Sequence, residues 1–330
     1  MDSKNAARLG QVPEATPAGT GSSADLPQNI FRYVFTISRF HQAALVLMAT
    51  AVFLLELVPL ELQRRIVNDV VKARSYRLVI LLCAVYCVAV LVQGGTKLVL
   101  NIYRSWIGER AVRDLRTRVE GLVDASADPE TQGVEASMMV AEVEPVGGFV
   151  AGSVSEPLLQ GGILLSTLAY MIHLDPWMAL TAVVIFAPQL AIVPLLQGAI
   201  VRRTDARIRV LRLLSVSVVL SNGPDEARNI DDRARIDRVF ELNMKIFRLK
   251  FTINFFMNFC NHLQVVAALL LGSWYVLHDE LAIGGVVSFI SAVGRLNDPW
   301  GDLVNYFRDL STTTVKYRLI ANAVNPAPPA

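Results

Sequence analysis

Six apolar stretches constrain this chain more than any other feature of its sequence. Each contains about 19 residues or more, enough for a helix to cross the ~30 Å hydrocarbon core of a bilayer. Because lipid offers a backbone no hydrogen-bond partners, a helix is the form expected for each stretch. The predicted spans are Gln42–Leu60, Leu78–Ile102, Val154–Leu174, Pro176–Ile200, Thr252–Leu277 and Leu281–Tyr306. The sequence therefore predicts an all-α integral membrane protein with six long membrane-spanning helices.

The composition agrees with spans that carry water-facing extensions. Hydrophobic residues make up 53% of the chain, yet 18% of its residues are charged. The net charge of +2 gives no global field for nucleic acid, and three cysteines are too few for a secreted disulfide scaffold. Residues 1–30 are rich in small and polar residues, lack an apolar core of the signal-peptide type, and are expected to be disordered. We expect the helical domain to cover residues 31–323 and a flexible tail to follow over residues 324–330.

Positive charges are distributed unevenly between the two sets of connections. The segments before the first span, between spans two and three, between spans four and five, and after span six hold 24 Lys and Arg residues, against five in the other connections. Cytoplasmic loops carry the excess of Lys and Arg. Both termini are therefore expected in the cytoplasm, with the chain most simply placed in a bacterial inner membrane.

Two connections on the expected inner side are about 50 residues long and have helical periodicity. In Ile107–Val123, apolar residues recur at three- and four-residue intervals between charges, and Arg202–Leu220 and Arg233–Phe251 show the same pattern. Helices two to five are thus predicted to continue past the membrane as two long helical hairpins. Turn-rich tips break these hairpins at Asp128–Gly133 and Ser221–Asp225.

This pattern resembles the transmembrane domain of ABC exporters, the type IV or type 1 exporter fold. Gly108–Arg116 is similar to the charged stretch that leaves helix two in that family, and Leu281–Phe289 is similar to the segment that opens helix six. Glu226, Ile230 and Arg238–Phe240 fall where the family has its second coupling segment and the following helix. The resemblance covers about residues 30–323.

The resemblance implies a helix-swapped dimer, with a second transmembrane subunit that is either identical or different. Helices four and five would cross to the partner, and the inner tips would dock on ATP-binding domains. ATP binding there would tilt the helices and expose a central cavity to each side in turn. The residues implied in coupling to the ATPase are Gly133, Met138, Glu142, Glu226, Arg228 and Ile230.

A phosphate-binding loop is absent from the sequence. No G-x-x-x-x-G-K-[ST] segment occurs, and the nearest approach, Gly94–Lys97, lies inside the second predicted span. The roughly 25 residues after span six are also too few for a nucleotide-binding domain. We expect no catalytic residue, metal or cofactor in this chain, and we expect ATP and Mg on a separate ABC ATP-binding subunit.

Ionisable residues inside spans are costly and are candidates for function. Arg295 and Asp298 share one face of the sixth span, and a pair at i, i+3 is expected between them. Asp302, Asn305 and Asp309 continue this face, either along a polar path or already beyond the bilayer. Asn258 and Asn261 in span five either face a cavity or bond to another helix. The candidate substrate path is therefore Arg295, Asp298, Asn258 and Asn261. Pro299 is expected to kink its helix.

Three functions remain open at this stage. The first is the permease subunit of an ATP-driven exporter whose substrate is a lipid, a peptide or an amphipathic drug. The second is an uncoupled membrane scaffold or regulator that keeps the same fold without transport. The third is an intramembrane enzyme, which is the weakest because no Ser/His/Asp, His-cluster or paired-carboxylate set lies at matching depth.

Overall fold

A computed structural model describes residues 26–71, 76–123, 142–219 and 226–324. The regular elements described there are all helical, which confirms the predicted all-α class. They are α1 (Ile30–Leu55), α2 (Leu57–Val71), α3 (Tyr76–Val123), α5 (Ser155–Leu174), α6 (Pro176–Val219), α7 (Glu226–Leu277), α8 (Ile283–Gly294) and α9 (Asn297–Val324). Residues 142–152 form a further helical segment before α5. The predicted disordered segment up to residue 25, both predicted tips (Asp128–Gly133 and Ser221–Asp225) and the tail from residue 325 lie outside the described residues.

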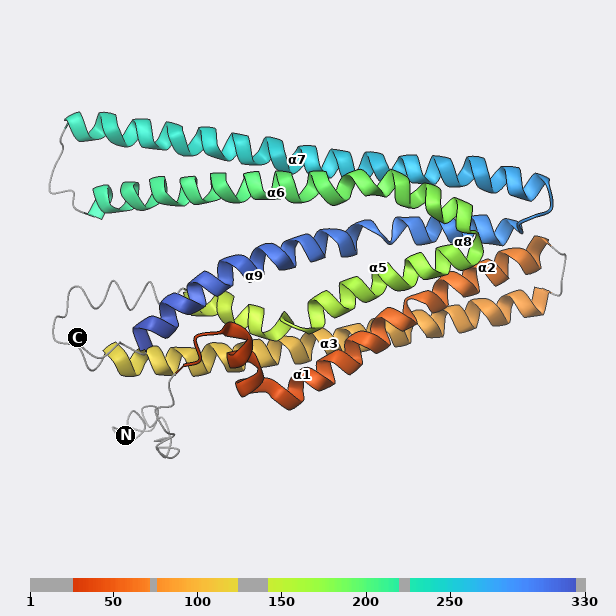
Figure 1. Ribbon diagram of the computed structural model, residues 1–330, viewed down its shortest axis with the longest axis horizontal. Coiled ribbons are helices and arrows are strands. Elements are labelled where there is room, and N and C mark those ends of the chain that lie inside the picture. Colours follow the sequence, from red (N-terminus) through yellow and green to blue (C-terminus); the bar gives the residue numbers. More distant parts are fainter. Residues whose placement is uncertain (1–25, 72–75, 124–141, 220–225, 325–330) are drawn as a thin grey trace, which may run out of the picture.

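The helices run side by side along the long axis of the molecule (Figure 1). The end of α2, the start of α3 and the connections α5–α6 and α7–α8 lie at one end, and the far ends of α3, α6, α7 and α9 point to the other. This arrangement places the two predicted inner hairpins at the same end of the molecule. We call it the stalk end.

Five of the six predicted spans are helical stretches long and apolar enough to cross a membrane. These stretches are Ile30–Val71, Tyr76–Val119, Ser155–Leu174, Pro176–Leu211 and Asp231–Leu277. The sixth prediction, Leu281–Tyr306, does not form one continuous helix, because the chain breaks between α8 and α9 at Arg295 and Leu296. Pro299 has no N–H to donate to the carbonyl of residue 295, which explains the break and confirms the expected kink.

A second break of the same origin divides the first span. Pro59 cannot donate to the carbonyl of Leu55, and α1 ends at Leu55 while α2 begins at Leu57. The helix then continues to Val71, eleven residues beyond the predicted end at Leu60. This extension was not predicted from the sequence, because the charged residues of α2 make the segment resemble a polar connection.

Three helices are far longer than a bilayer requires. The 48 residues of α3, 44 of α6 and 52 of α7 correspond to about 72, 66 and 78 Å at 1.5 Å per residue. The predicted helical extensions of spans two, four and five are therefore confirmed as helices. The extension of span three differs: a turn at Ser153 and Val154 separates residues 142–152 from α5.

The core at the stalk end joins segments that are distant in the sequence. Leu26, Tyr33 and Leu115 are buried there with Val146 and Tyr317, so α1, α3, residues 142–152 and α9 share one apolar cluster. The Tyr317 hydroxyl donates to the Pro27 carbonyl oxygen at 2.6 Å. Burial raises the pKa of Tyr317 above its ordinary value, so the hydroxyl keeps the proton that it donates.

The α6–α7 pair is the most separate part of the molecule. These helices pair along their lengths and join the remaining helices mainly through α5 and α8 (Figure 1). A small cluster of Val193, Ile253 and Val304, with Trp300 beside it, connects the middle of the pair to α9. Many large apolar side chains of α3, α6 and α7 remain exposed, as expected for surfaces that face lipid or another chain.

Candidate functional site

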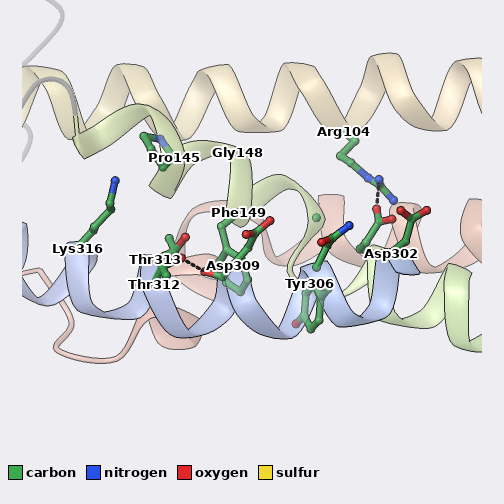
Figure 2. A pocket seen from close by; sticks show the side chains of 13 residues that line it. Arg104, Pro145, Gly148, Phe149, Asp302, Tyr306, Asp309, Thr312, Thr313 and Lys316 are labelled. Carbon is green, nitrogen blue, oxygen red and sulfur yellow. Dashed lines mark hydrogen bonds and ion pairs between the residues drawn. The ribbon is translucent and has the colours of Figure 1, made fainter. Parts of the chain in front are cut away.

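A charged cavity of about 500 Å³ lies between α3, the segment 142–156 and α9 (Figure 2). It follows α9 from Asp302 to Lys316, which is about 21 Å of helix. Its charged side chains are Arg104, Glu156, Asp302, Asp309 and Lys316. Three carboxylates against two cations make the lining rich in charge and slightly acidic. We call this space the stalk cavity.

A polar network closes the end of the stalk cavity nearer the apolar spans. Arg104 of α3 forms an ion pair with Glu156 in the first turn of α5. The Gln160 side-chain amide donates to Glu156 Oε1 and to Asp302 Oδ2, each at 2.9 Å. Gln160 thereby links two carboxylates on different helices, and the network ties α3, α5 and α9 together. Nε and Nη2 of Arg104 are buried and have no hydrogen-bond partner among the described residues.

An aromatic contact forms one wall of the stalk cavity. The rings of Phe149 and Tyr306 stack with centroids 5.8 Å apart, and the Tyr306 hydroxyl donates to the Ser153 carbonyl oxygen at 2.6 Å. Gly148 and Gly152 also line the cavity. A Cβ added at Gly148 would meet no atom within 4 Å. Because glycine has no side chain, these two positions leave the cavity wider than larger residues would.

The structure places Arg295 in a different contact from the one expected. Arg295 follows the last residue of α8, within the break between α8 and α9, and its Nη1 lies 2.8 Å from Glu56 Oε1 and 2.9 Å from the Glu56 carbonyl oxygen. Gln93 of α3 also donates to the Glu56 carboxylate. Among the described residues the ion pair of Arg295 is with Glu56, so the expected pair with Asp298 is wrong. Asp298 itself is exposed in the first turn of α9.

The remaining residues of the candidate path lie on α7, away from the stalk cavity. Asn258 is exposed, and Asn261 has a buried side-chain oxygen without a partner in the described residues. Gln264, close by, donates to the Ala182 carbonyl oxygen of α6 at 2.8 Å, which is the helix-to-helix bonding that was one of two expectations for this region. Asn258, Asn261, Arg295 and Asp298 do not line the stalk cavity. Their role in a path stays a prediction.

The residues implied in coupling are only partly within the described chain. Gly133 and Met138 lie outside it. Glu142 begins the helical segment 142–152, and Glu226 begins α7, with Arg228 and Ile230 in its first two turns. Both positions are at the stalk end, where the resemblance expects an ATPase to dock (Figure 1).

Sequence reasoning missed Arg104, Glu156 and Gln160. A signal for them was present, because Arg104 follows the second apolar stretch and Glu156 opens the third. Opposite charges at matching ends of consecutive antiparallel spans lie at similar depth and are natural partners. Asp302, Asn305 and Asp309 were recognised as one face of a helix, and all three do line the stalk cavity.

Comparison with known proteins adds one distant relative. No protein-family model matches the chain. The chain is 26% identical over 233 residues to a protein of Syntrophus aciditrophicus (strain SB) described as an ATP-dependent lipid A-core flippase. The similarity covers 65% of this chain but only 38% of that relative. Together with the five apolar helices, it supports a multi-pass membrane protein with a role related to ABC transporters.

Proposed function

We propose that this chain is the membrane-spanning permease subunit of an ATP-driven exporter of the ABC type. In this proposal six segments cross the membrane, the broken α8–α9 pair being the sixth, and the stalk end lies in the cytoplasm. A separate nucleotide-binding subunit supplies ATP hydrolysis. The excess of Lys and Arg in the connections at the stalk end supports this orientation.

The α6–α7 hairpin is the observation that carries this proposal. Its longer helix, α7, extends about 78 Å, more than twice the thickness of a hydrocarbon core, and the end of α6 and the start of α7 lie at the same end of the molecule as the end of α3 (Figure 1). Two rigid helical stalks that end together offer a docking surface for an enzyme that works outside the bilayer. The similarity to an ATP-dependent flippase favours an ATPase as the docked protein.

Co-purification from detergent-solubilised native membranes tests the ATPase partner. We expect an ATP-binding protein to be recovered with the full-length chain and its recovery to fall at least tenfold when residues 221–232 are deleted. A milder variant, Glu226→Lys with Arg228→Glu, should lower recovery in the same direction. The control, Asp279→Asn with Glu280→Gln, changes two charges in the connection at the opposite end and should leave recovery unchanged.

The scaffold alternative predicts a different outcome of the same experiment. If no ATP-binding protein is recovered with any variant, and vesicles containing the chain and ATP move no substrate, the chain is an uncoupled membrane scaffold or regulator. Loss of recovery in the Asp279 and Glu280 control as well would show that the variants act on folding and not on docking.

The stalk cavity is the part of the substrate path that the geometry supports best. It combines a charged network with an aromatic wall, which suits an amphipathic molecule. Arg104 contributes a guanidinium to the lining whose Nε and Nη2 have no hydrogen-bond partner among the described residues. Among lipids, peptides and amphipathic drugs, the flippase relative favours a lipid.

Two matched substitutions distinguish the stalk cavity from the path predicted by sequence alone. Asp302→Asn removes a carboxylate that lines the cavity, and Asp298→Asn removes one four residues away that does not. If substrate passes through the cavity, Asp302→Asn should change the concentration of substrate needed for half-maximal stimulation of ATPase activity roughly tenfold, the scale of one hydrogen bond to a charged group. A tenfold change with Asp298→Asn alone would instead favour the path through Arg295 and Asp298.

A further inference from the structure

A second pocket lies at the bend of α1, away from the stalk cavity. Ser38 interrupts the helix with φ −134° and ψ 28°, and its hydroxyl donates to the Val34 carbonyl oxygen at 2.8 Å. Gln42 holds the bend by donating to Ser38 Oγ and to the Val150 carbonyl oxygen. The first turns of α1 therefore run across the long axis of the molecule (Figure 1). Beside this bend lies a pocket of about 660 Å³. We call it the elbow pocket.

The elbow pocket is strongly basic. Arg32 and Arg39 of α1 and Arg110 of α3 line it, and its lining includes no Asp or Glu. Within the described residues, none of the three guanidinium groups forms an ion pair with a carboxylate. Arg110 lies against the Trp106 ring, 5.7 Å from its centroid, and its Nη1 is 3.4 Å from His41 Nε2. Three cations converge on one pocket, and no carboxylate in the part of the chain that the structure describes neutralises them.

The rim of the elbow pocket is aromatic and exposed. Phe40 is 85% exposed and Phe35 is 49% exposed, although both belong to a segment otherwise fixed in the fold. Phenylalanine at this exposure is unfavourable in water, because each buried side chain of this size gains about 1.5–3 kcal/mol. These rings are therefore expected to lie in a membrane. They would place the pocket beside lipid.

The depth of the elbow pocket is set by α3. Tyr103 and Trp106 follow directly after the apolar stretch that ends at Ile102, and Tyr103 bonds to His41 of α1 with 2.5 Å between its hydroxyl oxygen and Nδ1. Tyr and Trp gather at the interface between hydrocarbon and headgroups. Since Arg110 is one to two turns further from the hydrocarbon, the guanidinium groups lie at headgroup level.

We propose that the elbow pocket binds the headgroup of an anionic phospholipid. Guanidinium groups bind phosphate oxygens in a bidentate fashion, and three of them suit a headgroup that carries net negative charge. Phe35 and Phe40 would contact the acyl chains of the same molecule. A free phosphate ion would leave both rings without a role, which is why we assign the site to a lipid. This site depends on membrane insertion but not on transport or an ATPase.

Quenching of Trp106 by brominated lipid tests the site directly. In the full-length chain, Trp177, Trp274 and Trp300 are replaced by Phe so that fluorescence reports Trp106 alone. The protein is placed in symmetric vesicles of unlabelled phosphatidylcholine that contain a fixed fraction of brominated phosphatidylglycerol or of brominated phosphatidylcholine. We expect brominated phosphatidylglycerol to quench Trp106 more strongly than brominated phosphatidylcholine does. Each basic residue that contacts the headgroup should contribute about a fivefold preference for the anionic lipid.

Matched charge removals identify the residues responsible. Arg32→Gln with Arg39→Gln should reduce the preference for phosphatidylglycerol at least fivefold, whereas Arg202→Gln with Arg209→Gln, two exposed arginines of α6, should leave it intact. Arg110 stays unchanged because it contacts the reporter ring. As a second measurement, native mass spectrometry of the unmodified chain should retain one more phosphatidylglycerol than the Arg32 and Arg39 variant does.

Three results would overturn the proposal. The first is equal quenching by the two brominated lipids together with equal lipid retention by mass spectrometry. The second is the same loss of preference in the Arg202 and Arg209 control, which would reflect net charge alone. The third is loss of the preference in inorganic phosphate but not in sodium chloride of equal ionic strength, which would assign the pocket to a free phosphate ion.

Discussion

At the scale of single residues, the Glu56–Arg295 ion pair joins two helices that are each interrupted by a proline. It joins residues 239 positions apart, and both side chains are mostly shielded, with exposed fractions of 18% and 28%. The pair lies where two helices are interrupted by proline, and each proline removes one backbone hydrogen bond from its helix. There the Arg295 guanidinium donates to both the carboxylate and the carbonyl oxygen of Glu56. Removing one partner would leave a shielded charge without its counter-ion.

A double-mutant cycle measures this pair. Glu56→Gln and Arg295→Gln should each lower the stability of the protein in lipid nanodiscs, and the double variant should be less destabilised than the sum of the two. We expect a coupling energy of about 1–3 kcal/mol, the range for residues in direct contact. Reversible unfolding in nanodiscs by denaturant titration provides the free energies. Strict additivity of the two changes would contradict the contact.

The location of Glu56 shows where reasoning from sequence failed at this scale. The predicted first span ended at Leu60, which placed Glu56 close to the membrane surface. Because α2 continues to Val71, Glu56 lies about 22 Å from the end of that helix and level with Arg295. Local sequence patterns identify each helix. Whether Glu56 and Arg295 can pair depends on their being at the same depth along the helix bundle, and the depth of Glu56 cannot be judged until the end of α2 is known.

At the scale of elements, small residues let helices approach closely at the stalk end. A Cβ added at Gly147 would lie 2.2 Å from Val112 Cγ2 and 2.9 Å from the Gly108 carbonyl oxygen. The segment 142–152 therefore packs against α3 through two glycines, which is a typical contact between membrane helices. Gly148, the next residue, faces the open stalk cavity instead.

These neighbouring glycines give a matched pair of substitutions. Gly147→Ala should destabilise the protein by about 1–3 kcal/mol, because the added methyl group meets backbone as well as side-chain atoms. Gly148→Ala should be neutral or slightly stabilising, since alanine is the better helix former. The midpoint of thermal unfolding in one detergent compares the two variants. Equal midpoints for both would contradict the close packing of these helices.

The helices themselves were largely predictable from the sequence, but their interruptions were predictable only in part. Apolar length located five spans, and helical periodicity located the extensions in α3, α6 and α7. The kink at Pro299 was predicted from the sequence. The break at Pro59 was not predicted, because this proline lies near the end of a predicted span, where prolines are common. The stalk cavity could not be predicted, because it depends on how α3, the segment 142–156 and α9 lie against one another.

At the scale of the whole molecule, the exposed face of α7 bears on the proposed second transmembrane subunit. Phe240 and Phe247 are 65% and 47% exposed in the part of α7 that carries Arg238, Lys245 and Arg248, beyond the apolar stretch Thr252–Leu277. Lipid tails cover apolar side chains only within the hydrocarbon core. These two rings fit a contact with the proposed second transmembrane subunit, which would cover them outside the bilayer.

Polar substitution of these rings tests the dimer. Phe240→Ser with Phe247→Ser should weaken dimerisation at least tenfold, because each ring contributes about 1.5–3 kcal/mol when it is buried. Light scattering coupled to size-exclusion chromatography in detergent measures the oligomeric state. Phe259→Ser, within the apolar part of α7, is the control and should change it less. A monomeric parent chain would contradict the helix-swapped dimer.

The contact between α2 and α8 has a mechanical consequence. Gly284 N–H donates to Asn68 Oδ1 and Ser288 Oγ donates to the Leu60 carbonyl oxygen, so these two helices form one bonded unit. A break beside Pro59 separates α2 from α1, and a break beside Pro299 separates α8 from α9. Both breaks are at the level of Glu56 and Arg295. The α2–α8 unit therefore ends, on its inner side, at the level of the Glu56–Arg295 contact, and a tilt of the unit about that contact would preserve both hydrogen bonds that join its two helices.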